Sequence, residues 1–269
     1  MIYTVQGAPL YAYTGGKDFD PSKPTAVFIH GVLNDHSVWI LQTRYFANHG
    51  WNVLAIDLPG HGRSGGKAPA SVQEAAQSVI ALMDAAGVNK AILMGHSFGS
   101  LIAMQAAAEH PDRVSQLVMV GTAYPMRVSP ALLESSISNP HKAIDMVNVF
   151  SHSTLAPPPS ALGPGTWLLG GSKALMRRVL ASNPHENIFN IGFKACDQYD
   201  QGETAITQVM CPTLFLLAKK DQMTPPKAAQ SLIQKARDGH VAWVNAGHQL
   251  MVEAPEECLN AMLAFCKKS

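Results

Sequence analysis

Charged residues and long hydrophobic runs are both scarce in this sequence. Only 14% of its residues are charged, its formal net charge is +1, and no run of basic residues is longer than two. A surface of this kind does not attract polyanions, which excludes nucleic acid and anionic membranes as main partners. No stretch approaches the roughly twenty apolar residues of a membrane span, and the N-terminus lacks the pattern of a signal peptide. We therefore expect a cytoplasmic protein without a membrane span.

Cysteine is scarce as well. The chain has four cysteines, none in C-x-x-C spacing: Cys196, Cys211, Cys258 and Cys266. Thiols stay reduced in the cytoplasm, and a structural zinc site needs closely spaced ligand pairs. We predict reduced thiols, no disulfide, no metal and no cofactor.

Apolar residues are abundant and their pattern is regular. Of 269 residues, 47% are hydrophobic, as expected for one α/β domain with a large core and a sizeable insertion. After a β-hairpin at 2–5 and 10–13, apolar strand-like runs at 25–30, 51–57, 91–96 and 114–121 alternate with helix-like segments. The clearest helix, 71–86, begins with a capping box at Ser71 and Glu74 and stops at Gly87. This alternation predicts a mostly parallel sheet of about eight strands with helices on both faces.

The alternation stops at Thr122 and resumes at about residue 210. Between them lie helix-like segments at 130–138, 141–151 and 172–181 and a proline-containing loop at 156–165, with no apolar strand. We predict a core of residues 1–121 and 210–269 and an inserted helical cap of residues 122–209. The loop is a natural place for a mobile lid. The final strands and helices are expected at 212–218, 227–235, 240–245 and 255–266.

One stretch, 91–110, carries the strongest chemical signal. It is a strand, a sharp turn and a helix, and the turn is the G-x-S-x-G motif Gly95-His96-Ser97-Phe98-Gly99. A second match, 62–66, holds Ser64, but it follows a loop and precedes glycines and a proline that cannot open a helix. Only Ser97 has a strand before it and a helix after it, so we predict that Ser97 is the nucleophile.

A serine nucleophile needs a base, and the base needs an acid. His248 follows the last strand, which places it at the same sheet edge as Ser97. Asp221 ends the loop after the strand at 212–218. The order Ser97, Asp221, His248 is the chain order of a triad on this kind of sheet.

With these pieces in place, the chain resembles the α/β-hydrolase superfamily, in its serine-nucleophile, esterase-like branch. The matching pieces are His30-Gly31, Asp57-Leu-Pro-Gly-His-Gly-Arg-Ser64, Gly95-His-Ser-Phe-Gly99, Asp221 and Gly247-His248. The resemblance implies that Ser97 attacks, His248 is the general base and Asp221 orients it. It also implies an oxyanion hole made by the backbone N–H groups of Val32 and Phe98.

Two details narrow the chemistry that the resemblance implies. A serine in place of an aspartate disfavours haloalkane dehalogenase and epoxide hydrolase activity. Val32-Leu-Asn-Asp35 replaces the Gly-Gly-Pro-Gly run of proline iminopeptidases and many carbon–carbon bond hydrolases, which weakens both of those interpretations. The loop 57–64 resembles a family signature whose role is mostly structural.

The resulting hypothesis is a carboxylesterase that forms an acyl-enzyme on neutral esters of small to medium acyl groups. Candidate pocket residues are Tyr124, Trp167, Met223 and Leu250. The alternatives are lactone, amide, thioester or carbon–carbon bond hydrolysis, perhydrolysis, or a small-molecule-binding relative without turnover. The sequence leaves the oligomeric state, monomer or homodimer, open.

Overall fold

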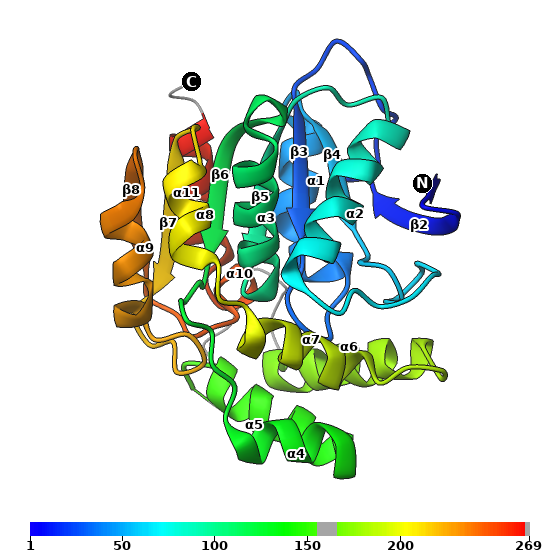
Figure 1. The fold of residues 1–269 in the computed structure, drawn as a ribbon, viewed down its shortest axis with the longest axis vertical. Helices are drawn as coiled ribbons and strands as arrows, with labels where there is room; N and C mark the ends of the chain where they lie inside the picture. The colour runs from blue at the N-terminus through cyan, green and yellow to red at the C-terminus, as the bar shows by residue number, and fades with distance from the viewer. Residues whose placement is uncertain (155–165, 267–269) are drawn as a thin grey trace.

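An eight-stranded sheet forms the centre of the molecule (Figure 1). The computed structural model describes residues 1–154 and 166–266. The strand order is β1-β2-β4-β3-β5-β6-β7-β8; β1 and β2 run antiparallel to their neighbours, and the other pairs are parallel. The strands are β1 (Ile2–Val5), β2 (Ala8–Tyr13), β3 (Thr25–Ile29), β4 (Asn52–Ile56), β5 (Ala91–His96), β6 (Val114–Val120), β7 (Thr213–Ala218) and β8 (Gly239–Val244). The predicted fold class is confirmed.

Helices cover both faces of the sheet. One face carries α2 (Val72–Ala85), α3 (Phe98–Glu109), α8 (Gly202–Gln208) and α9 (Gln230–Lys235). The other carries α1 (Ile40–Asn48), α10 (Leu250–Glu253) and α11 (Pro255–Cys266). Short 3-10 helices are η1 (His36–Trp39), η2 (Pro111–Arg113) and η3 (Pro226–Ala229). All five residues of β3 are buried, with Val27 and Ile29 in one core and Ala26 and Phe28 in the other, because successive side chains of a strand point to opposite faces.

Local signals place most of these elements where the sequence predicted them. At the start of α2, the Ser71 hydroxyl accepts a hydrogen bond from the Glu74 N–H at 3.1 Å, and Gly87 follows with φ of 69°. The amphipathic segment 37–50, which has the pattern of one helix, is divided into η1 and α1, because the Asp35 carboxylate accepts from the Ser37 N–H and caps a tighter first turn.

Helices also fill the segment between β6 and β7. They are α4 (Pro130–Ser138), α5 (Pro140–Ser151), α6 (Leu168–Ser182) and α7 (Ile188–Gln198), followed by α8. Helices α4 to α7 lie beyond the carboxyl ends of the strands (Figure 1) and share a separate hydrophobic core, whereas α8 packs against α3. Within 122–154 and 166–209 there is no strand. The predicted loop and lid at 156–165 lie outside the described residues.

Helices α7 and α8 were not foreseen from the sequence. Helix α7 contains two phenylalanines, two isoleucines and Gly192, and α8 begins with Gly202 and contains two threonines. These residue types have weak helix propensity, so packing of the buried face stabilises both helices.

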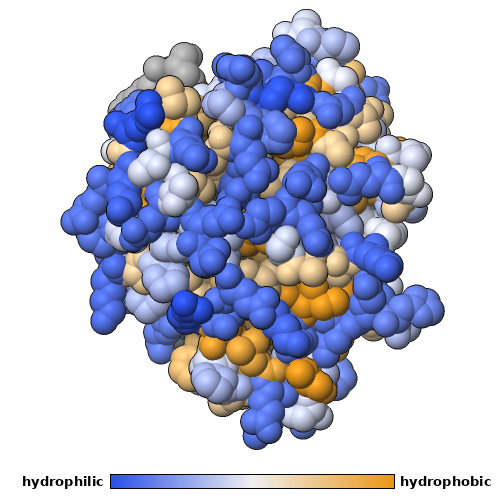
Figure 2. All heavy atoms as spheres, in the orientation of Figure 1, coloured by the Kyte–Doolittle hydropathy of each residue, from blue (hydrophilic) through white to orange (hydrophobic). Residues whose placement is uncertain are grey.

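The surface is mostly hydrophilic on the face shown in Figure 2, and its hydrophobic side chains gather over the region of α4 to α7. The exposed large hydrophobic residues of this region are Ile137, Val149, Phe150 and Trp167. None of the helices in the described part of the chain has the length and apolar character needed to cross a membrane.

Candidate active site

Ser97 occupies a strained turn between β5 and α3. Its φ is 54° and its ψ is −119°, in the left-handed half of backbone space that a side-chain-bearing residue adopts only when its surroundings force it. The Ser97 N–H donates to the Val120 carbonyl of β6 at 2.9 Å, and the Ser97 carbonyl accepts from the Ser100 N–H at 2.8 Å. These bonds hold the serine at the carboxyl end of β5 and the N-terminus of α3.

The glycines of the motif are required by close packing. A Cβ on Gly95 would overlap the carbonyl of Gly99, and a Cβ on Gly99 would overlap the carbonyl of Ile29 at the end of β3. A Cβ on Gly31 would lie 3.2 Å from the Ser97 Cβ. Glycine is therefore required at positions 95 and 99 for the strand and the helix to meet around Ser97, and a side chain at position 31 would have little room.

Asp221 and His248 meet beside this turn, from the loops after β7 and β8. The Asp221 Oδ1 accepts from the N–H groups of Met223 and Thr224 at 2.9 and 2.8 Å. Its Oδ2 accepts from the Thr224 hydroxyl and from the His248 Nδ1, each at 2.8 Å. Thr224 Oγ1 also lies 3.0 Å from His248 Nδ1 and 2.9 Å from the Gly121 carbonyl. Thr224 thus joins the ends of β6, β7 and β8.

The Asp221 carboxylate is buried and charged. Burial alone raises its pKa, but the neighbouring His248 and the hydrogen bonds from His248 and Thr224 lower it by more, so the pKa lies below the ordinary value. A charged acceptor at Nδ1 fixes the imidazole as the tautomer with its proton on Nδ1 and a free lone pair on Nε2. No hydrogen bond joins the described side chains of Ser97 and His248, which line the same cavity. The distance between a catalytic serine and its base is often long when no substrate is bound.

His96 packs against the ring of His248 and forms a hydrogen bond with its backbone. Its ring centroid lies 4.6 Å from that of His248, and its Nε2 donates to the His248 carbonyl at 2.9 Å. Burial, with a smaller effect of His248, lowers the pKa of His96 to about 3, so its ring is neutral. His96 is therefore a packing and hydrogen-bonding residue.

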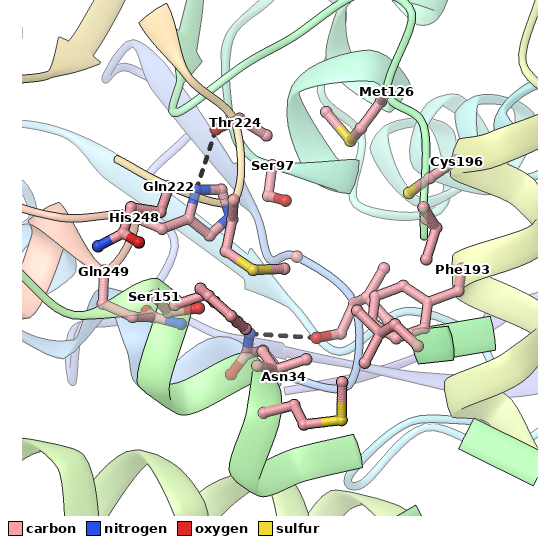
Figure 3. Close-up of a pocket in the computed structure, with 18 of the residues that line it drawn as sticks. Asn34, Ser97, Met126, Ser151, Phe193, Cys196, Gln222, Thr224, His248 and Gln249 are labelled. Atoms are coloured by element: carbon pink, nitrogen blue, oxygen red, sulfur yellow. Dashed lines mark hydrogen bonds between the residues drawn. The ribbon is translucent and has the colours of Figure 1, made fainter. Parts of the chain in front are cut away.

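A cavity of about 310 Å³ opens above Ser97 and is shown in Figure 3. Met223, one of the four predicted pocket residues, lines it. The other three are not among its described lining residues, and this corrects their predicted place. Tyr124 donates to the Asp200 carbonyl at 2.5 Å, Trp167 is 59% exposed, and Leu250 is buried in the core of the opposite sheet face. Hydrophobicity near the motif cannot tell a cavity wall from core packing or surface.

The predicted oxyanion donors lie next to Ser97. Val32 lines the cavity directly after Gly31, and Phe98 is the first residue of α3. Neither N–H donates any of the hydrogen bonds found between described residues. A free N–H in the first turn of a helix and another in the facing turn are suited to bind an anionic oxygen.

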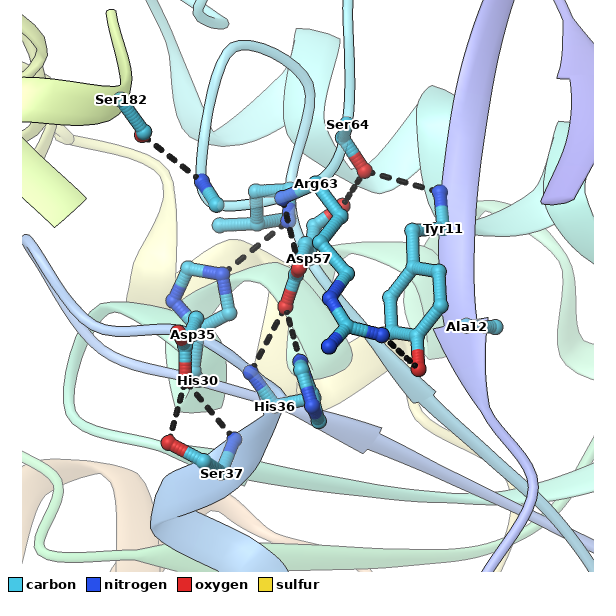
Figure 4. A network of polar contacts seen from close by, with 12 residues as sticks. Tyr11, Ala12, His30, Asp35, His36, Ser37, Asp57, Arg63, Ser64 and Ser182 are labelled. Atoms are coloured by element: carbon cyan, nitrogen blue, oxygen red, sulfur yellow. Dashed lines mark hydrogen bonds and ion pairs between the residues drawn. The ribbon is translucent and has the colours of Figure 1, made fainter. Parts of the chain in front are cut away.

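The loop 57–64 is a polar network behind the site (Figure 4). The buried Asp57 carboxylate accepts from the His36 N–H and Nδ1, at 2.8 and 2.7 Å, and from the Arg63 N–H at 2.9 Å. The Ser64 hydroxyl donates to the Asp57 carbonyl at 2.6 Å and accepts from the Tyr11 N–H at 2.9 Å. Ser64 therefore ties this loop to β2 and does not line the cavity above Ser97.

Comparisons with known proteins agree with this architecture. A family model described as alpha/beta hydrolase fold matches residues 24–155, and another described as TAP-like protein matches residues 190–265. Lipase LipV of Mycobacterium tuberculosis is 36% identical over 106 residues, which are 39% of this chain and 40% of that protein. The (E)-2-((N-methylformamido)methylene)succinate hydrolase of Acinetobacter baylyi is 25% identical over 249 residues, 89% of each chain. The matches to the first two curated relatives span only 40% and 28% of their lengths.

Solved structures give the same result for the fold. The enol-lactonase from Burkholderia xenovorans has a TM-score of 0.83 at 18% identity, covering 99% of this chain and 100% of that one. The esterase from Exiguobacterium antarcticum has a TM-score of 0.82 at 16% identity, covering 99% and 98%. A mostly parallel eight-stranded sheet with a serine at a strand-to-helix turn defines an α/β hydrolase. The chain belongs to the alpha/beta hydrolase superfamily.

Proposed function

We propose that this protein hydrolyses carboxylic esters through Ser97, His248 and Asp221. The observation that carries the proposal is the buried Asp221–His248 pair, which shares the edge of the sheet with a serine on a turn of positive φ. Such a pair orients an imidazole to take a hydroxyl proton, which a serine needs because its hydroxyl is a weak nucleophile at neutral pH.

The proposed reaction is acyl transfer in two steps. Ser97 Oγ attacks the ester carbonyl as His248 Nε2 takes its proton, and the N–H groups of Val32 and Phe98 bind the oxyanion. His248 returns the proton to the leaving alcohol as the carbon–oxygen bond breaks, which leaves an acyl-enzyme on Ser97. Water activated by His248 then releases the acid, while Asp221 stays ionised throughout.

We also propose that residues 122–209 are a cap whose helices α4 to α7 shape the acyl site, whereas α8, near the end of this segment, packs on the core helix α3. The cavity walls contributed by this segment include Met126, Leu132, Met176 and Phe193. Their apolar surface, and a cavity of about 310 Å³, suit a neutral acyl group of small to medium size. A cytoplasmic location and the absence of a cofactor stay predictions.

The experiment is hydrolysis of p-nitrophenyl esters of increasing acyl length by wild type, Ser97→Ala and Ser64→Ala. Ser64 is the matched control because it is the other serine in a G-x-S-x-G match. Wild type should turn over short or medium esters, and Ser97→Ala should lose about 10⁴-fold in kcat. Ser64→Ala should keep its activity. Turnover that survives in Ser97→Ala would refute the assignment.

Hydrolysis of lactones, which are cyclic esters, uses the same steps, so a lactone series belongs in the same assay. If no ester or lactone is turned over, amide, thioester or carbon–carbon bond hydrolysis, perhydrolysis, or ligand binding without turnover would replace the proposal.

A further inference from the structure

Besides His96 Nδ1, two buried polar atoms of the residues that line the cavity have no hydrogen-bond partner among the described residues: Asn34 Oδ1 and Ser151 Oγ. Asn34 is 4% exposed and Ser151 is 1% exposed, and both residues line the cavity with Ser97. An unpaired buried polar atom destabilises a fold, and native proteins rarely keep one without a reason. Neither atom has accessible surface in this structure, so a ligand that enters the cavity supplies the missing partner when the side chain turns toward it.

Neighbouring hydrogen bonds fix what each atom can bind. The Asn34 amide Nδ2 donates to the Val32 carbonyl at 3.3 Å, so its Oδ1 remains as an acceptor that needs a donor. Ser151 is the last residue of α5, and its carbonyl accepts from the Gln249 N–H at 3.1 Å. The Ser151 hydroxyl, which can donate and accept, is thus held against the loop of His248.

The cavity has two chemically different walls. In Figure 3, Ser151 and Gln249 lie on the same side of Ser97 as His248, whereas Met126, Cys196 and Phe193 lie on the opposite side and Asn34 lies between the two groups. Among the described lining residues, Arg127 is the only member of the group Asp, Glu, Lys and Arg; it is exposed, and its Nη1 donates to the Asp197 carbonyl at 2.7 Å. The site therefore suits a neutral molecule with one apolar end and one polar end.

The proposed reaction indicates which end of the substrate lies against each wall of the cavity. His248 must deliver its proton to the oxygen of the leaving alcohol, so the alcohol lies on the His248 side and the acyl group on the apolar side. Resting on the proposed ester hydrolysis, we propose that Asn34 and Ser151 bind a hydroxyl group carried by the leaving alcohol. The preferred substrates are then neutral esters of an apolar acid with a hydroxyl-bearing alcohol, such as a glycol or glycerol monoester.

A matched ester series tests this assignment. The substrates are propyl, 2-methoxyethyl and 2-hydroxyethyl hexanoate, which have leaving groups of similar size and differ in whether a hydroxyl proton is present. By initial rates in a pH-stat, wild type should show a kcat/KM about tenfold higher for the hydroxyethyl ester than for the other two. The methoxyethyl ester controls for the electron-withdrawing oxygen.

Variants assign the preference to residues. Asn34→Leu and Ser151→Ala should bring the hydroxyethyl-to-propyl ratio close to one. Met126→Leu, on the apolar wall, should leave that ratio unchanged. Ser151→Ala should also keep or raise the melting temperature, because it removes a hydroxyl that has no partner among the described residues.

Aryl ester turnover separates failure of this inference from failure of the proposed function. If wild type hydrolyses p-nitrophenyl butyrate through Ser97 but shows no hydroxyethyl preference, the hydroxyl site is refuted while the esterase assignment stands. The same holds if the preference persists in both Asn34→Leu and Ser151→Ala. If wild type hydrolyses neither aryl nor alkyl esters, the proposed function fails and this inference fails with it.

Discussion

Thr224 gives a sharp test of how the Asp221–His248 pair is held. Its hydroxyl lies 2.8 Å from Asp221 Oδ2, 3.0 Å from His248 Nδ1 and 2.9 Å from the Gly121 carbonyl. Thr224→Val keeps the shape of the side chain and removes this hydroxyl. Asp221 would then keep three of its four donors, the backbone N–H groups of Met223 and Thr224 and the ring of His248.

The expected loss is that of one hydrogen bond to a buried charge. This is about 1.5 to 3 kcal/mol of unfolding free energy at neutral pH. The direct Asp221–His248 bond remains, so kcat/KM should fall only about tenfold. The pKa of Asp221 is lowered in the folded state, so its contribution to stability is full above the unfolded pKa of 3.8 and disappears as pH falls through the folded value. Thr224→Val raises that folded pKa, and acid unfolding should begin at higher pH.

Urea denaturation between pH 3 and 7 and ester kinetics at neutral pH measure these effects. Thr224→Ser is the matched control, because it restores the hydroxyl without the methyl group, and it should recover most of both losses. Thr224→Val with wild-type stability and kinetics would refute the reasoning. Equal impairment of Thr224→Ser and Thr224→Val would point to packing of the methyl group instead of the hydrogen bonds.

Three further predictions concern the surroundings of the site. Gly95→Ala should lower the free energy of unfolding by more than about 3 kcal/mol, because its methyl group would overlap the Gly99 carbonyl. Gly171→Ala, which has open space in α6, should raise the free energy of unfolding by about 0.5 to 1 kcal/mol. Thermal denaturation compares the two variants, and similar effects would contradict the packing argument. Since the pKa of His96 falls from 6.5 to about 3 on folding, the unfolded chain binds its proton first, and wild type should lose about 2 kcal/mol between pH 7 and 5 through this group. His96→Gln should lose correspondingly less in urea titrations at the two pH values, and an unchanged difference would argue against a neutral buried ring. Tyr124→Phe should change kcat/KM less than about twofold, since Tyr124 lies outside the described cavity wall and its hydroxyl donates to the Asp200 carbonyl. A tenfold loss would indicate that Tyr124 contacts the substrate.

The core of the fold could be predicted because its signals are local. Alternating apolar runs identify buried parallel strands, and Ser71, Glu74 and Gly87 mark both ends of a helix within the sequence itself. The strand and helix around Ser97 separate its motif from the one at Ser64 for the same reason. Chain order alone brings Asp221 and His248 to one edge of the sheet.

The cavity could not be predicted in this way. Asn34 and Ser151 are far apart in the chain and reach one cavity only because the helices between β6 and β7 lie across the sheet edge. Leu250 and Trp167 are as hydrophobic as Met223, and only packing decides that Leu250 is in the core, Trp167 at the surface and Met223 at the cavity. Thr224 carried no motif of its own, although its position three residues after Asp221 could have indicated a side chain that caps the carboxylate.

The most direct test of the account is covalent labelling with an alkyl phosphonate ester that reacts with activated serines. Wild type should take up one equivalent, peptide mass spectrometry should place it on Ser97, and His248→Ala should abolish labelling because the serine loses its base. Absence of label in wild type, or label on Ser64 or another serine, would contradict the assignment of Ser97 as the nucleophile.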